Sequence, residues 1–141
     1  MKKKFSTAWK GSKQPRKQRK YRHNAPLHVR SSFMNVMLSK ELVAKHKVKR
    51  LRIRLGDKVK VMRGKNKGKE GKVDVLNVKK SNVKMTGVEV SKKDGSKAKA
   101  PIQVSNLMIV ELNLDDKKRL ESKKAAAATA PAPKKAKALN A

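Results

Sequence analysis

The sequence contains no cysteine, which excludes disulfides and thiolate metal sites. Aromatic residues make up only 3% of the chain, and all of them precede residue 34, so any later core must be aliphatic. No apolar run approaches the roughly 18 residues that a membrane-spanning helix needs. The basic start of the chain lacks the apolar segment of a secretory signal. We therefore expect a small protein without disulfides or a membrane span.

Acidic residues are also scarce. Asp and Glu total 10 against 40 Lys and Arg in 141 residues, which gives a formal net charge of +30 and an isoelectric point near 10.9. A domain this basic repels itself unless it meets a polyanion. Because the sequence shows no lipidation motif either, nucleic acid is a better candidate partner than a membrane surface.

The residues of catalysis and metal binding do not form a recognisable pattern. The three histidines (His23, His28 and His46) have no HxxH or HExxH spacing. The carboxylates are scattered among lysines and are typical of turn formers and local salt-bridge partners. The sequence therefore predicts no catalytic residues, metal site, cofactor or small-molecule substrate.

The first 38 residues form a basic arm. Residues 1–30 hold 11 Lys and Arg and no acid, with Pro15, Pro26 and little periodicity. We expect this arm to be disordered when free and to become ordered along RNA. Residues 39–50 then form a short helix and a linker, with Ser39 as the N-cap.

Residues 51–113 have the pattern of a small, mainly β barrel. Alternating valines predict strands over 58–61 and 73–78, and a change of parity at Leu76 predicts a bulge. Further strands are expected over 82–90, broken near Gly87, and at 102–104 and 107–112. Asp94-Gly95 is a hairpin signal. Residues 114–141 are expected to hold a short helix and a low-complexity Ala/Lys/Pro tail.

The stretch "RGKNKGKEGKV", residues 63–73, contains three glycines and four lysines. It is not a Walker loop, because Gly64 and Gly68 are separated by three residues and Val73 follows Gly71-Lys72. As a hairpin, its glycines can take positive φ or let an RNA backbone approach closely. Two interpretations stay open: an RNA-gripping loop or a solvated turn.

Trp9 and Tyr21 are aromatic residues within the basic arm. One interpretation is that they stack on unpaired bases or insert into an RNA groove. The other is that they pack on the barrel or on a neighbouring protein. The sequence does not favour either interpretation.

Three segments carry a family resemblance. Residues 56–78, "GDKVKVMRGKNKGKEGKVDVLNV", resemble the KOW motif. That motif consists of a strand, a Gly-Lys loop and a second strand. Residues 16–57, with "NAPLHVR" and "LSKEL", and residues 104–119, "VSNLMIVELNLDDKKR", resemble the archaeal and eukaryotic form of a universal large-subunit ribosomal protein family, the twenty-fourth in bacterial large-subunit numbering. The likeness covers roughly residues 13–120.

This resemblance implies an SH3-like barrel that binds the 5′ domain of large-subunit ribosomal RNA. It also implies an early role in subunit assembly and a place near the nascent-polypeptide exit of the cytoplasmic ribosome. Neighbouring ribosomal proteins and exit-site factors are the further partners it suggests. The alternatives are a KOW-type transcription elongation factor and a general basic nucleic-acid-binding protein.

The expected RNA-binding residues come from the arm, the quoted loop and later lysines, some from composition and some from the resemblance. Gly64, Gly68 and Gly71 are expected to shape the loop. The expected contacts are Lys13, Arg16, Lys17, Arg19, Lys20, Tyr21, Arg22, His23, Asn24, His28, Arg30, Arg63, Lys65, Asn66, Lys67, Lys69, Lys72, Lys79, Lys80, Lys92, Lys93, Lys97 and Lys99.

Overall fold

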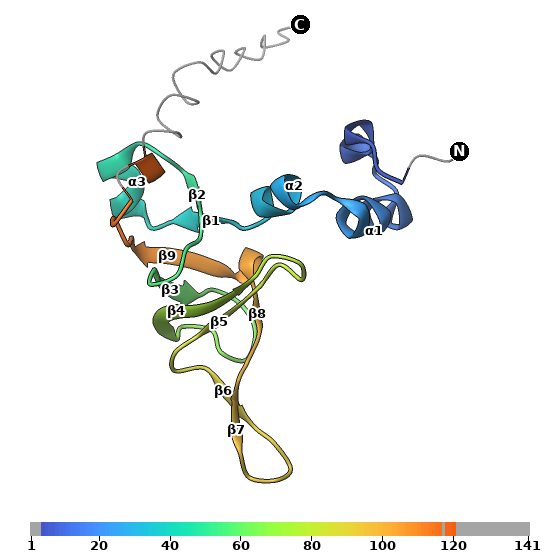
Figure 1. The fold of residues 1–141 in the computed structure, drawn as a ribbon. Helices are drawn as coiled ribbons and strands as arrows, with labels where there is room; N and C mark the ends of the chain where they lie inside the picture. The colour runs from blue at the N-terminus through green and yellow to red at the C-terminus, as the bar shows by residue number, and fades with distance from the viewer. Residues whose placement is uncertain (1–3, 117, 121–141) are drawn as a thin grey trace, which may run out of the picture.

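The described residues form a β-rich body and a helical arm (Figure 1). The computed structural model describes residues 4–116 and 118–120. Within these residues the mainly β, barrel-like class predicted from the sequence is confirmed, with nine strands and few helices. The assignment to the SH3-like type stays a prediction. The Ala/Lys/Pro tail lies outside the described residues.

The arm contains helices that its residue pattern did not predict. A 3-10 helix, η1 (Thr7–Gly11), precedes α1 (Pro15–Asn24) and α2 (Leu27–Ser32). Proline at the first position of α1 suits a helix start, because its missing N–H would have no partner there. The Gln18 side chain donates to the Lys10 carbonyl at 3.2 Å and so joins η1 to α1.

Aromatic packing holds the arm together. The rings of Phe5 and Tyr21 stack with centroids 5.1 Å apart, and the Phe33 ring meets Tyr21 edge-on at 6.1 Å. Tyr21 is the buried residue of α1, and Phe33 follows α2 directly. Periodicity did not reveal these helices, because α1 is basic on most of its surface and buries one large side chain.

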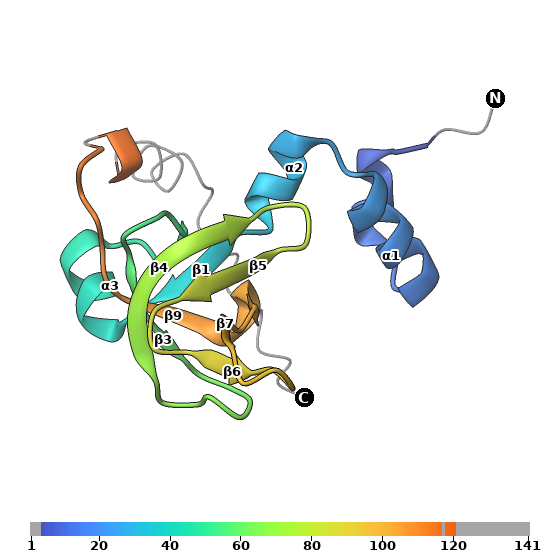
Figure 2. The same ribbon diagram turned by 60° about the horizontal axis from the view of Figure 1, so that its bottom comes forward.

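The main sheet has seven strands in the order β2-β1-β9-β3-β4-β5-β8. Its strands are β1 (Asn35–Leu38), β2 (Arg50–Arg52), β3 (Lys58–Val61), β4 (Glu70–Asn77), β5 (Asn82–Met85), β8 (Ile102–Gln103) and β9 (Leu107–Glu111). Figure 2 shows the long β4 curving around the body. A bulge is present in β4, but the register against β5 shifts between Val73 and Val75 rather than at Leu76, so Val75 is exposed and not in phase with Val73.

Strand β1 lies within the part of the sequence assigned to the arm. It pairs in parallel with β9, where Met37 is opposite Met108, and antiparallel with β2. Residues 35–38 therefore belong to the sheet in the structure. Four residues of alternating burial give a weak local signal, and only the remote partner β9 makes them a strand.

The predicted helix before the barrel is α3 (Lys40–His46). The hydroxyl oxygen of Ser39 accepts a hydrogen bond from the Leu42 N–H at 3.3 Å, so Ser39 is the N-cap as expected. Lys47 ends the helix in the left-handed conformation, with φ of 56°.

The remaining strands, β6 (Glu89–Ser91) and β7 (Lys97–Lys99), form a separate hairpin. Its turn uses Asp94-Gly95 as predicted, with Gly95 at φ of 80°. The Asp94 carboxylate accepts from the Ser96 hydroxyl at 2.7 Å and from the Ser96 N–H at 3.0 Å. Figure 1 shows this hairpin extending away from the barrel.

A single aliphatic core fills the barrel, as the positions of the aromatic residues predicted. Val59, Met85, Val88 and Ile109 are completely buried at 0% exposure. The other core members within the described residues are Met34, Val36, Leu38, Val48, Leu51, Ile53, Val61, Val73, Val83, Ala100, Ile102, Val104 and Leu107.

Candidate nucleic-acid interface

The expected RNA-binding side chains lie on the arm and on several barrel loops. On the arm, α1 exposes cations around much of its surface, and His28 is exposed on α2. The exposed cations of α1 and of the segment just before it are Lys13, Arg16, Lys17, Arg19, Lys20 and Arg22, and the His23 ring is exposed beside them. A cationic helix that projects from the side of the barrel (Figure 1) can lie along a polyanion without distorting the core.

The β3–β4 loop presents Arg63, Lys65, Lys67 and Lys69 to solvent. Its shape comes from internal hydrogen bonds, including Gly68 N–H to the Val61 carbonyl at 2.8 Å and Lys67 N–H to the Gly64 carbonyl at 3.0 Å. Asn66 contributes through its carbonyl, which accepts from the Lys69 N–H at 3.2 Å. The loop is therefore an ordered turn with exposed cations, a geometry that both the RNA-gripping loop and the solvated turn allow.

Two of the three predicted loop glycines have the expected geometry. Gly64 and Gly68 have φ of 92° and 89°, a region that residues with a Cβ rarely adopt. A Cβ at either position would meet nothing within 4 Å, so the space around them is open. These glycines shape the loop and leave its surface accessible.

Gly71 corrects the third expectation. It lies within β4, away from the loop tip, and its φ is not positive. A Cβ there would collide with the Thr86 carbonyl oxygen, well inside van der Waals contact. The close approach at Gly71 is therefore made by the protein's own backbone, so this glycine serves sheet packing rather than RNA access.

Three other expected contact residues are engaged within the protein. Tyr21 is only 6% exposed, which supports packing over stacking on a base. The Arg30 guanidinium donates to the Ala25 carbonyl at 2.8 Å and to the His23 carbonyl, so it joins α2 to the end of α1. Lys99 forms an ion pair with Asp74. Trp9 is half-buried, with the Lys20 ammonium 5.1 Å from its ring centroid.

The β6–β7 hairpin exposes Lys92, Lys93 and Lys97 at its end. Lys72 is exposed on β4, opposite Lys58 of β3. These cations lie on different elements from those of the arm, and Figure 1 shows the arm and the hairpin leaving the barrel in different directions. The expected residues do not form one pocket. They cover separate parts of an extended surface.

A small cleft lies where the arm meets the β4–β5 turn of the barrel. It is lined by Arg22, His23, Arg30 and Phe33 of the arm and by Lys79, Lys80, Ser81 and Gln103 of the barrel. Ser81, in the turn between β4 and β5, was not among the expected residues. The signal was present in "KKSN" between two alternating strands, which is typical of a hairpin turn.

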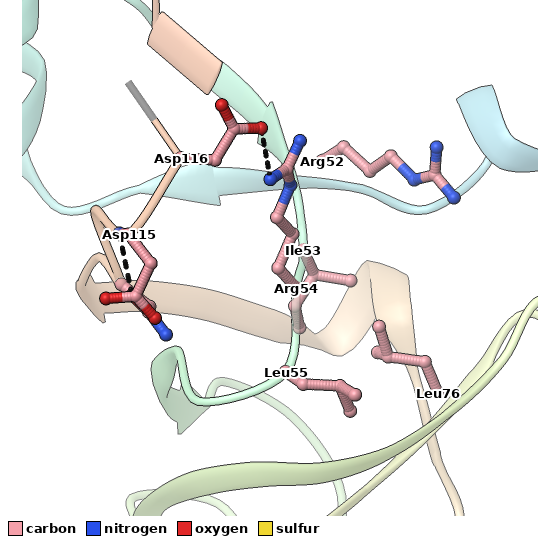
Figure 3. A pocket seen from close by; sticks show the side chains of 8 residues that line it. Arg52, Ile53, Arg54, Leu55, Leu76, Asp115 and Asp116 are labelled. Atoms are coloured by element: carbon pink, nitrogen blue, oxygen red, sulfur yellow. Dashed lines mark hydrogen bonds and ion pairs between the residues drawn. The ribbon is translucent and has the colours of Figure 1, made fainter. Parts of the chain in front are cut away.

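A larger pocket, of about 470 Å³, lies between the β2–β3 connection and the C-terminal segment (Figure 3). Arg54 and Asp116 meet beside it in an exposed ion pair at 2.6 Å, and Leu55 and Leu76 provide apolar walls. Asp115 also lines it, and its N–H donates to the Asn113 side chain at 3.0 Å. The Arg54 guanidinium holds the pKa of Asp116 below its ordinary value, which is typical of a salt bridge rather than a proton-transfer group.

The other resolved pKa shifts also come from local partners. The Ser96 hydroxyl and N–H lower the pKa of the Asp94 carboxyl. The hydrogen bond and charge of Glu111 raise the pKa of the Lys58 ammonium. Within residues 4–116 and 118–120, no three His, Cys, Asp or Glu side chains come together as metal ligands. No helix in this same part of the chain is long and apolar enough to cross a membrane.

The fold and surface define a class: a small, strongly basic, barrel-like β protein with a cationic arm. Comparisons with known proteins specify it further. The model of the family that comprises the eukaryotic ribosomal proteins L26 and their archaeal L24 counterparts matches residues 12–124.

Curated relatives agree with this match. A large ribosomal subunit protein uL24 from Methanocella arvoryzae is 52% identical over 111 residues, which cover 79% of this chain and 89% of the relative. The protein of the same name from Methanospirillum hungatei is 48% identical, over 77% of this chain and 90% of the relative. That from Methanothrix thermoacetophila is 49% identical, over 77% and 93%.

The chain belongs to this ribosomal protein family. It is a structural, non-enzymatic constituent of the large subunit of the cytoplasmic ribosome. The resemblance drawn from the KOW-like loop and its flanks is thereby confirmed. Residues 1–11, which include η1, precede the matched range, so the packing of η1 on α1 is a feature that the family match does not cover.

Proposed function

We propose that this ribosomal protein is a two-part clamp on large-subunit ribosomal RNA, in which the barrel loops and the helical arm neutralise backbone phosphates. The target we propose is the 5′ domain of that RNA, with an early role in subunit assembly and a position near the nascent-polypeptide exit. Neighbouring large-subunit proteins and exit-site factors are the proposed protein partners.

The observation that carries the proposal is the placement of exposed cations on two bodies joined at a cleft. On the arm, the cations stand on an ordered helix that is braced by Phe5, Tyr21 and Phe33. On the barrel, the β3–β4 loop is ordered by its own hydrogen bonds. Ordered cationic surfaces of this kind suit the phosphate backbone of folded RNA, because they can recognise its shape without a code for base edges.

Salt dependence provides the first test. If about ten phosphates are neutralised, a plot of log affinity against log salt should have a slope on the order of −7 to −9. Filter binding to the 5′ domain and to a 3′ domain of large-subunit RNA, at several salt concentrations, measures both slope and preference. Equal affinity for the two RNA domains would refute the proposed target.

A matched charge test assigns a role to the arm. The triple variant Arg16→Gln, Lys17→Gln, Arg19→Gln removes three exposed charges from α1, and glutamine preserves the helix because it is a good helix former. The control, Lys40→Gln, Lys45→Gln, Lys49→Gln, removes the same charge from the α3 region. We expect the α1 variant to lose far more affinity. Equal affinity losses in the two triple variants would show that the arm contributes only through its net charge and not through its position.

Order of addition tests the assembly role. Large subunits are reconstituted from RNA and purified proteins, with this chain added either in the first step or only in the last step. Assembly should be slower when the chain is added only in the last step. An identical rate of assembly in both cases would contradict an early role.

A further inference from the structure

In the cleft between arm and barrel, cations from both bodies line a common space. Arg22 and Arg30 lie on the arm side, and Lys79 and Lys80 lie in the β4–β5 turn. These residues are at least 49 positions apart in the sequence, since Arg30 and Lys79 are the nearest pair across the cleft. Only the fold brings them together.

The charge of the cleft is unbalanced. Among the described residues that line it, there is no carboxylate; two arginines and two lysines share the cleft with Phe33, Ser81, Gln103 and the imidazole of His23. Cations held this close to one another repel, and an anion between them removes that repulsion. The volume is about 210 Å³. At roughly 30 Å³ for each water, this is room for one phosphodiester group and its bridging waters.

The barrel side of the cleft is rigid. The Asn77 side-chain oxygen accepts from the Lys80 N–H at 3.0 Å and fixes the turn. Ser81 adopts the left-handed conformation with φ of 54°, and its carbonyl accepts from the Val104 N–H at 3.3 Å. A non-glycine residue in this region carries backbone strain, which is often found at binding sites.

The arm side is also held in place. The Arg30 guanidinium uses its Nε and one of its two terminal nitrogens on the Ala25 and His23 carbonyls. These bonds hold Arg30 at the junction of α1 and α2, beside the exposed Arg22. Phe33, which packs against Tyr21, forms part of the same wall. Both walls are thus ordered before any ligand arrives, which lowers the entropy cost of binding.

We propose that this cleft is a phosphodiester-binding site in which arm and barrel grip the same segment of RNA backbone. Arg22 acts from the arm and Lys80 from the barrel, and the Ser81 hydroxyl can donate to a phosphate oxygen. The site thereby sets the angle between the arm and the barrel on the RNA. This inference rests on the proposed function, since it names one specific site within the RNA clamp.

A double-mutant cycle tests whether the two sides share a ligand. The variants are Arg22→Gln, Lys80→Gln and the double variant, measured by filter binding to the 5′ domain RNA. Residues that hold one phosphate are energetically coupled, so the affinity loss of the double variant should differ from the product of the single losses by at least about threefold. For the double variant, the magnitude of the salt slope should decrease by about 1, since the contact to a single phosphate is lost.

A matched cycle pairs Arg22→Gln with Lys65→Gln. Lys65 is exposed at the β3–β4 loop and does not line the cleft. Here the affinity loss of the double variant should equal the product of the single losses to within about twofold. The magnitude of the salt slope should decrease by about 2, because contacts to two separate phosphates are lost. All substituted side chains are exposed, so thermal unfolding should be unchanged and should confirm that each variant is folded.

The outcomes separate the two proposals. If wild-type protein does not prefer the 5′ domain RNA, the proposed function fails. If it does, and the control cycle multiplies as expected, a cleft cycle that also multiplies overturns the shared-phosphate site and leaves the clamp intact. A decrease of about 2 in the magnitude of the salt slope of the Arg22→Gln, Lys80→Gln variant also overturns the shared-phosphate site.

Discussion

Arg119 and Asp57 form a buried, two-pronged ion pair across 62 positions of the sequence. Arg119 Nη1 lies 2.7 Å from Asp57 Oδ1, and Nη2 lies 2.6 Å from Oδ2, with side-chain exposures of 2% and 0%. Asp57 also accepts from the Arg54 and Asn113 N–H groups at 2.7 and 3.0 Å. The pair therefore joins the C-terminal segment, the β2–β3 connection and the end of β9.

Breaking this pair should strongly destabilise the barrel. We expect Arg119→Leu to cost about 3–5 kcal/mol in free energy of unfolding, because it leaves the Asp57 carboxylate buried without its cation. The double variant Asp57→Leu, Arg119→Leu should remain destabilised, since the Arg54 and Asn113 N–H groups lose their acceptor.

Urea unfolding measures these differences. The control is Lys58→Leu, which removes an exposed pair with Glu111 and should cost far less stability, because water and salt screen exposed ion pairs. A similar loss for Arg119→Leu and Lys58→Leu would show that burial adds nothing to the Arg119–Asp57 pair.

Gly71 and the loop glycines should respond differently to substitution. Gly71→Ala should cost about 3 kcal/mol of stability, because its Cβ would press on the Thr86 carbonyl in the sheet. Gly68→Ala should cost about 1 kcal/mol, from positive φ alone.

The control for this pair is Gly11→Ala, where a Cβ would meet nothing within 4 Å and φ is not positive. Chemical denaturation of the three variants provides the measurement. If Gly71→Ala is as stable as Gly11→Ala and binds RNA less well, the close approach at Gly71 would belong to RNA after all.

Tyr21 should act through folding of the arm. Tyr21→Ala removes the ring between Phe5 and Phe33, so α1 should loosen and helical circular dichroism should fall. Tyr21→Phe keeps the ring and should preserve the helix. The fluorescence of Trp9, the single tryptophan, is a local probe of this packing. It should change when α1 moves and the Lys20 ammonium no longer lies over the Trp9 ring. Unchanged signals in Tyr21→Ala would contradict a bracing role.

Asp116 should titrate at an acidic pH set by Arg54. Arg54 lowers the pKa of the Asp116 carboxyl from 3.8, chiefly through the hydrogen bond between them. Stability from this lowered pKa is present above pH 3.8 and is lost as the pH falls through the folded-state pKa. Arg54→Met should raise the pKa of Asp116, as measured by carboxyl NMR titration. The pKa of Asp94, which is set by Ser96, should not move.

Local patterns predicted much of the barrel. Alternating valines marked β3 and β4, Ser39 marked the start of α3, and Asp94-Gly95 marked the β6–β7 turn. These features depend on neighbours within a few residues, so their signals stand in the sequence itself. Composition and spacing also gave the positions of candidate RNA-binding lysines. They did not indicate which of these side chains is engaged in an ion pair or hydrogen bond within the protein.

Contacts between remote segments were not predictable in the same way. Strand β1 exists because β9 pairs with it, and Tyr21 is buried because Phe5 and Phe33 pack around it. Gly71 has the same local setting as a loop glycine, and only the position of Thr86 distinguishes it.

By itself, the sequence determined the charge, the aliphatic barrel core, the hairpins and the ribosomal family, because residue chemistry and short-range periodicity are sufficient for each. Tertiary structure alone decided which cations face a shared cleft and which are paired. It placed Arg22 and Lys80 in one cleft, and Arg119 against Asp57. Electrostatic energy depends on distance and burial, and these exist only once distant parts of the chain have packed together.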